Sequence, residues 1–200
     1  MAQVVSLWLG YWHPWVFCSS ERSLYESHEG ICLYLKTASY KRLDDLSCCN
    51  DHEVLWVKLR PKRLPRGFSS LIAEVVSHPH WTATENDCMR DHLFQSLLLA
   101  ESRFPNCALI VAGDFNRLEV KSIQRHFRLK QIVKKPTRKN AILDLVLTNM
   151  HGFYADPQHF PTFGLSDHHT FTIEPKERIE SVNLQNLYWS VTTEEVGEPS

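Results

Sequence analysis

The chain has 200 residues, 43% of them hydrophobic and 22% charged, and a formal net charge of −1. This length allows one large hydrophobic core and hardly two, and the composition is ordinary for a globular domain. The near-zero charge neither supports nor excludes nucleic acid as a partner. No apolar run reaches the length of a membrane span, so we expect no membrane association.

The six cysteines follow neither a metal-binding nor a disulfide pattern. None of them forms a Cys-x-x-Cys pair, and Cys48 and Cys49 are adjacent. This spacing argues against a zinc framework and against a small disulfide scaffold. We therefore predict reduced thiols in an intracellular protein, nuclear or cytoplasmic, and we expect a monomer.

Residues 1–28 do not match the pattern of the rest of the chain. The stretch 4–15 is apolar and aromatic, but no positive charge precedes it, and His13 and Pro14 interrupt it. A cleaved signal peptide is therefore less favoured than a segment of foreign sequence joined to a truncated domain.

Three apolar runs in the first half of the chain predict strands, at residues 30–35, 54–59 and 70–76. Pro61 and Pro65 indicate a basic turn or loop at residues 58–66.

A helix is predicted at residues 87–104, because apolar residues recur there at steps of four, four and three. Thr84 or Asn86 is the expected cap, and Pro105 lies just beyond the end. The apolar face consists of Met89, Leu93, Leu97 and Ala100.

The second half of the chain continues with short strands and one further helix. Residues 108–112 predict a fully apolar strand, and the polar turn 113–116 (Gly-Asp-Phe-Asn) follows it directly. We expect a short helix at 120–127, strands at 129–133, 142–147 and 170–173, and a loop at 163–169. Residues 176–200 are acidic and polar, so we expect a disordered tail. These elements favour the α/β class, as a two-layered β-sandwich flanked by helices.

The turn after the strand 108–112 carries the first candidate site residues. Asp114 and Asn116 offer a carboxylate and an amide two residues apart, and such positions point the same way in an extended segment. A carboxylate can orient or deprotonate a water, and an amide can hold a phosphate oxygen. The alternative is an ordinary strand-to-helix turn, in which Asp and Asn are common.

Two further carboxylates and a histidine lie in or beside later strands. Asp144 falls inside an apolar run, where a buried aspartate costs free energy unless it is paired. It is either an edge residue facing water or a carboxylate that orients a histidine. Asp167 and His168 follow Ser166, and such a pair can hold a metal with one side chain and meet a phosphate with the other. His169 also suggests zinc, but no spaced His/Cys set completes a tetrahedral site.

A local block of basic residues lies between residues 117 and 139, with Glu119 as its only acid. Such a block can contact phosphates although the whole chain is near neutral, and a solvated basic face is equally consistent with it. Its members are Arg117, Lys121, Arg125, Arg128, Lys130, Lys134, Lys135, Arg138 and Lys139.

The three polar motifs, in this order and each beside an apolar strand, resemble the later motifs of the endonuclease/exonuclease/phosphatase superfamily. The similarity is greatest to the apurinic-endonuclease-like domain of LINE-type (non-LTR) retrotransposons, in the phrases LKQIVKKPTR, LDLVLTN and FGLSDHH. The resemblance implies a domain at residues 29–175 with that superfamily's fold.

The resemblance also implies metal-assisted hydrolysis of a phosphodiester, with a nick in DNA as the product. Asp114 would activate or orient the attacking water, and Asn116 would position the phosphate. Asp144 would fix the tautomer of His168, which would stabilise the charge that develops on the phosphate.

The cofactor and partner that the resemblance implies are Mg²⁺ (or Mn²⁺) and DNA. Asp167 would help to hold the cation, and Thr137, Arg138 and Ser166 would lie at the rim near the DNA backbone.

The sequence departs from the family pattern at its start. The family's first strand carries an Asn, and a metal-ligating Glu follows, but neither is found before Gly30. Ser77 also stands where the family often has Tyr. We therefore expect weakened Mg²⁺ binding and an exposed sheet edge, and one hypothesis is that the aromatic N-terminal stretch covers this edge. A fragment of a mobile element is the simplest origin of such a chain.

Four functional interpretations follow. The first is an active metal-dependent DNA endonuclease, and the second is a catalytically inactive remnant of the same fold with at most weak DNA binding. The third is a phosphatase of inositol phosphates or sphingolipids, against which the LINE-like phrases argue. The fourth is a zinc metalloprotein, against which the His/Cys spacing argues.

Overall fold

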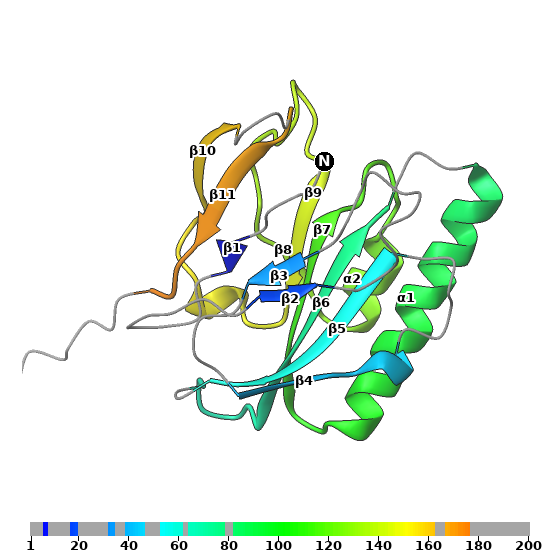
Figure 1. Ribbon diagram of the computed structural model, residues 1–200, viewed down its shortest axis with the longest axis vertical. Helices are drawn as coiled ribbons and strands as arrows, with labels where there is room; N and C mark the ends of the chain where they lie inside the picture. The colour runs from blue at the N-terminus through cyan, green and yellow to red at the C-terminus, as the bar shows by residue number, and fades with distance from the viewer. Residues whose placement is uncertain are drawn as a thin grey trace, which may run out of the picture.

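The computed structural model describes residues 6–7, 17–19, 32–34, 39–46, 53–61, 64–78, 82–162 and 167–176. A six-stranded mixed sheet is its central layer (Figure 1). The strand order is β4 (Ser39–Arg42), β5 (Glu53–Arg60), β6 (Ser70–Ser77), β7 (Cys107–Asp114), β9 (Asp144–Thr148) and β8 (Lys130–Gln131). Neighbouring strands are antiparallel except β6 and β7, and α1 (Ala83–Arg103) forms the crossover that this parallel pair requires.

A second sheet lies on the side of the central sheet opposite α1 (Figure 1). Its order is β1 (Ser6–Leu7), β11 (His169–Ile173) and β10 (Gln158–Thr162). A separate pair consists of β2 (Phe17–Ser19) and β3 (Cys32–Tyr34). The remaining elements are α2 (Lys121–His126) and the 3-10 turns η1 (Asp44–Leu46) and η2 (His151–Phe153). The described chain is thus a mixed α/β structure with few helices, as the sequence predicts.

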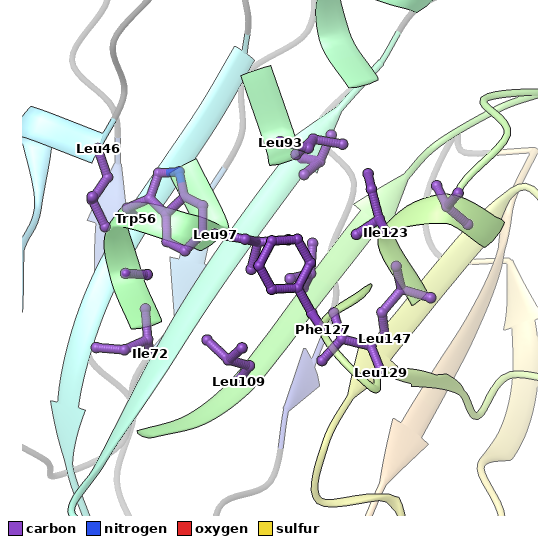
Figure 2. Close-up of a cluster of buried hydrophobic side chains, with 14 of the residues drawn as sticks. Leu46, Trp56, Ile72, Leu93, Leu97, Leu109, Ile123, Phe127, Leu129 and Leu147 are labelled. Carbon is purple, nitrogen blue, oxygen red and sulfur yellow. The ribbon is translucent and has the colours of Figure 1, made fainter. Parts of the chain in front are cut away.

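Two hydrophobic cores cover the two faces of the central sheet. One contains Ile110 and Val146 of the sheet together with Phe171 and Ile173 of β11. The other lies beneath α1 and α2, where Leu97 of α1 packs among the side chains of the sheet (Figure 2). Because both faces are covered, β6 and β7 are buried along almost their whole length, which explains why β7 is apolar up to its end and why β6 is apolar apart from Glu74 and its terminal serines.

The long helix begins earlier than predicted. Thr82 is its N-cap: the Thr82 hydroxyl accepts a hydrogen bond from the backbone of Glu85, and the Glu85 carboxylate accepts one from the backbone of Thr82. The prediction of Thr84 or Asn86 as the cap is therefore wrong. It followed the apolar repeat, which starts only at Met89, whereas the Thr-x-x-Glu capping box sets the start one turn upstream.

Some strands lie outside the predicted ranges. The sequence did not indicate β4 or β10, and the predicted strand 129–133 is reduced to the two residues of β8. β10 is an edge strand, mostly exposed, with Pro161 at a shift in its register with β11. Proline at an edge removes no hydrogen bond from the sheet but breaks the pattern by which a strand is recognised in sequence.

Part of the N-terminal segment pairs with the predicted domain. Ser6 and Leu7 form a parallel ladder with Thr172 and Ile173 of β11. The hypothesis that the aromatic stretch covers a sheet edge stays a hypothesis, because residues 8–16 lie outside the described residues, as does the predicted tail from residue 177 on. The boundary between residues 28 and 29 remains a prediction. Among the described residues, no helix is both long and apolar enough to cross a membrane.

Glu74 is an exception in the core beneath α1. Its side chain is 1% exposed, and neither carboxyl oxygen has a hydrogen-bond partner among the described residues. Its neighbours across the sheet are Trp56 and Val111. Burial raises the pKa of Glu74 well above its usual value. With respect to Glu74, the folded protein is therefore most stable at a pH below the unfolded-state pKa of this carboxyl. This stability is lost as the pH rises through the folded-state pKa.

We expect Glu74→Leu to raise the free energy of unfolding at neutral pH by about 1–3 kcal/mol, the usual cost of an unsatisfied buried polar group. The gain should shrink in acid, where Glu74 is neutral in both states. Urea unfolding across this pH range measures the difference. The control is Glu101→Leu on the exposed side of α1, with an expected change within about 0.5 kcal/mol. A Glu74→Leu variant no more stable than the wild type at neutral pH would contradict this account.

Candidate active site

Two carboxylates face each other where β7 ends and β9 begins. Asp114 and Asp144 are direct partners in this antiparallel ladder, which places their Cβ atoms about 5 Å apart. By strand alternation both side chains share the face of Ala112 and Val146, which looks toward the second sheet. Like charges directly opposite each other are destabilising unless a positive group compensates them.

His168 supplies this compensation from the segment that leads into β11. Its Nδ1 lies 2.8 Å from Oδ2 of Asp144, and Asp144 is only 3% exposed. The hydrogen bond predicted from the sequence is therefore present, and the alternative of Asp144 as a water-facing edge residue is wrong. Because Nδ1 donates to the carboxylate, Nε2 is the ring nitrogen left toward Asp167, whose Oδ1 lies 3.9 Å away.

The environment favours the protonated form of His168. The hydrogen bond to Asp144 raises its pKa, burial opposes this in part, and the negative charges of Asp144, Asp114 and Asp167 raise it further. The net pKa of His168 lies above its usual value. A protonated histidine can stabilise an anionic phosphate or donate a proton.

Thr137 holds the backbone around this pair. Its hydroxyl accepts hydrogen bonds from the backbone N–H groups of Leu143 and Asp144, at 3.0 and 3.1 Å, and its carbonyl accepts one from His169. The residue is fully buried. The prediction that Thr137 lies at a DNA-contacting rim is therefore wrong, because its polar atoms bind the strands that carry Asp144 and His168.

Arg138 and Asp167 form an ion pair beside His168. Arg138 Nε donates to Asp167 Oδ2 at 2.7 Å, and both side chains are partly exposed. Desolvation acts to raise the pKa of Asp167, but the hydrogen bond and the charge of Arg138 outweigh it and lower the pKa. Ser166, the third predicted rim residue, lies outside the described residues.

The described residues do not form a preassembled metal site. They contain no group of three or more His, Cys, Asp or Glu side chains that could hold a metal ion. Asp167, the predicted ligand, is already paired with Arg138. The described side chains therefore assign no step of a reaction to a metal ion.

Asn116 adopts a left-handed backbone conformation, with φ of 47°, which asparagine tolerates better than most residues. Its N–H donates to Asp114 Oδ1 at 2.9 Å, and its Nδ2 donates to Asp114 Oδ2 at 3.1 Å. Nδ2 also donates to the carbonyl of His78, a buried residue that the site prediction did not include. A histidine that ends an apolar strand was the signal for it in the sequence.

Gly113 brings β7 close to β6 just before Asp114. It lies inside the ladder, not in the turn that the sequence suggested, and its φ is 142°. A Cβ built at this position would lie 1.9 Å from the carbonyl oxygen of Val76. Only glycine therefore permits this approach, which sets where Asp114 leaves the strand.

The site therefore combines a carboxylate at Asp114, an oriented amide at Asn116 and a carboxylate–imidazole pair at Asp144 and His168. Such groups can orient a water and stabilise negative charge on an acyl or phosphoryl centre. No protein-family model matches the chain, and no curated protein is significantly similar to it. Its function is therefore inferred from its motifs and from this geometry.

We expect Asp144→Asn to lower the pKa of His168, because it removes both the charge and the charge-assisted hydrogen bond that stabilise the imidazolium. Asp167→Asn should lower it less, since Asp167 acts from a longer distance. NMR titration of the His168 ring measures both. Asp156→Asn, which removes only an exposed ion pair with Lys134, is the control and should leave the titration unchanged. Equal effects of Asp144→Asn and Asp156→Asn would contradict the assigned cause.

Proposed function

We propose that the chain is a DNA endonuclease of the endonuclease/exonuclease/phosphatase fold, derived from a LINE-type retrotransposon, which nicks DNA by hydrolysing a phosphodiester. The observation that carries the proposal is the convergence of three separate motifs on one site. These motifs come from distant points of the sequence and meet where the central sheet faces β11. The first supplies Asp114 and Asn116, the second Asp144 and the third His168.

In this reaction Asp114 orients or deprotonates the attacking water, and Asn116 keeps the Asp114 carboxylate in place through two hydrogen bonds. His168, held by Asp144, stabilises the charge that develops on the phosphate. The pKa of His168 above its usual value supports this role, because the charged ring is the form that stabilises an anion.

Exposed basic residues of the block between residues 117 and 139 support DNA as the substrate. Arg138 lies beside His168, and seven exposed lysines and arginines that make no described ion pair belong to the same basic block as Arg138. Phosphate contacts of this kind give affinity without sequence preference. The seven are Arg117, Lys121, Arg125, Arg128, Lys130, Lys135 and Lys139.

The proposed cofactor is Mg²⁺ or Mn²⁺, as the resemblance of the motifs implies. Among the described residues Asp167 is the ligand that we propose, and it would have to exchange Arg138 for the cation. Mg²⁺ is commonly bound through one or two carboxylates together with waters and substrate phosphates, so a single protein ligand implies weak binding before DNA is present.

The second candidate is a catalytically inactive remnant of the same fold. The pairing of Asp167 with Arg138, and the lack of a metal-ligand group among the described residues, favour it. Such a remnant would retain the Asp144–His168 pair as a structural contact.

Nicking of supercoiled plasmid in the presence of Mg²⁺ tests the proposal. We expect Asp114→Asn and His168→Ala each to lower the rate by about 10²–10⁴-fold, the usual contribution of one acid–base or charge-stabilising group. A chelator should abolish nicking, and the control variant Asp156→Asn should nick as the wild type does. A wild-type protein that is folded by circular dichroism but silent would overturn the proposal in favour of the inactive remnant.

A further inference from the structure

His78 takes no part in the proposed chemistry, but it makes three contacts. Two of them are to the site residues Asp114 and Asn116, and the third is to Asn86, which holds the His78 ring. It directly follows β6 and is 1% exposed. Its backbone N–H donates to the carbonyl of Asp114 at 2.8 Å, and its own carbonyl accepts a hydrogen bond from Asn116 Nδ2. Its ring Nε2 lies 2.6 Å from Oδ1 of Asn86, at the start of α1.

These contacts settle which way the Asn116 amide points. Its Nδ2 faces two acceptors, the carbonyl of His78 and Oδ2 of Asp114. The opposite orientation would set an amide oxygen against two acceptor oxygens, which have no hydrogen to share. The buried Oδ1 of Asn116 has no hydrogen-bond partner among the described residues. The Asn116 amide therefore directs its donor at His78 and Asp114, whereas the sequence led us to expect a donor to a phosphate oxygen.

The side chain of His78 fixes the position of the carbonyl that holds Asn116. Asn86 Oδ1 is an acceptor only, so His78 Nε2 carries the hydrogen of this bond. Asn86 is itself held by the backbone bond from its N–H to the Thr82 carbonyl, at 3.0 Å. The first turn of α1 thereby restrains the segment after β6, and this segment restrains the Asn116 amide.

We propose that His78, held by Asn86, is a positioning residue that sets the Asn116 amide with its Nδ2 on the Asp114 carboxylate, the group that orients the attacking water. The inference rests on the proposed function, because that reaction supplies the water. With the Asn116 N–H on Oδ1 of Asp114 and Nδ2 on Oδ2, the carboxylate keeps the orientation in which it accepts a hydrogen from the attacking water. We call the hydrogen bond between His78 and Asn86 the tether. When the tether is lost, every catalytic group remains, but the Asn116 amide is free to turn.

The test compares two alanine variants in the first turn of α1. Asn86→Ala removes the acceptor for His78, and Thr82→Ala removes the cap, which costs about 1 kcal/mol of stability without touching His78. Asn86→Asp keeps an acceptor and serves as the conservative rescue. Side-chain amide hydrogen exchange of Asn116, measured by NMR, reports the amide without any need for activity. We expect Asn86→Ala to speed this exchange by about tenfold or more, and Thr82→Ala and Asn86→Asp to change it by less than about twofold.

Kinetics add a readout that a merely structural role would not move. Asn86→Ala should lower kcat for nicking by about tenfold and leave KM unchanged, because the water is positioned only for the chemical step. Unchanged Asn116 exchange in Asn86→Ala, or equal acceleration in Thr82→Ala, would overturn the tether. Faster exchange in Asn86→Ala alone, with a wild type that does not nick, would support the tether and overturn the proposed function instead.

Discussion

Two aspartates face each other across neighbouring strands, and the negative charge that they place there is the constraint on which the rest of the site depends. The ladder between β7 and β9 fixes Asp114 opposite Asp144, and water screens the pair less than at the surface because Asp144 is buried and Asp114 is half-buried. His168, which lies just before β11, compensates this charge in its protonated form. The raised pKa of His168 is the direct result. Charge compensation therefore depends on sheet packing, because His168 can reach Asp144 only when β11 lies against the central sheet.

The surroundings of this pair are organised by backbone hydrogen bonds more than by side-chain charges. Thr137 bonds the start of β9 and the start of β11 at once, so the two elements that carry Asp144 and His168 share one anchor. His78 does the same on the other side, where it joins the end of β7, the Asn116 amide and the start of α1. Strained or tightly packed positions support this arrangement: Gly113 permits the approach of β7 to β6, and Asn116 adopts a left-handed conformation.

The sequence was most informative where one residue type has few acceptable environments. A buried aspartate in an apolar strand must be paired, and the family resemblance named His168 as the partner that the structure shows. The long buried strands and the apolar face of α1 were likewise predictable, because burial on both sides demands continuous apolar residues. The role of Thr137 could not be predicted, because a threonine in a polar, basic stretch gives no sign that its hydroxyl accepts hydrogen bonds from two backbone N–H groups. His78 was overlooked because its part depends on tertiary neighbours 8 and 38 residues away. β10 was overlooked because an exposed edge strand with a proline has no alternation to detect.

The central claim is that Asp144 acts through His168 in phosphodiester hydrolysis, and a double-mutant cycle on plasmid nicking tests it most directly. The rates of Asp144→Asn, His168→Gln and the double variant are compared with that of the wild type, with folding checked by circular dichroism. Residues that act as one unit have strongly non-additive effects. The account predicts that the double variant is no slower than the slower single variant. Multiplying losses, or a folded wild type without activity, would contradict it.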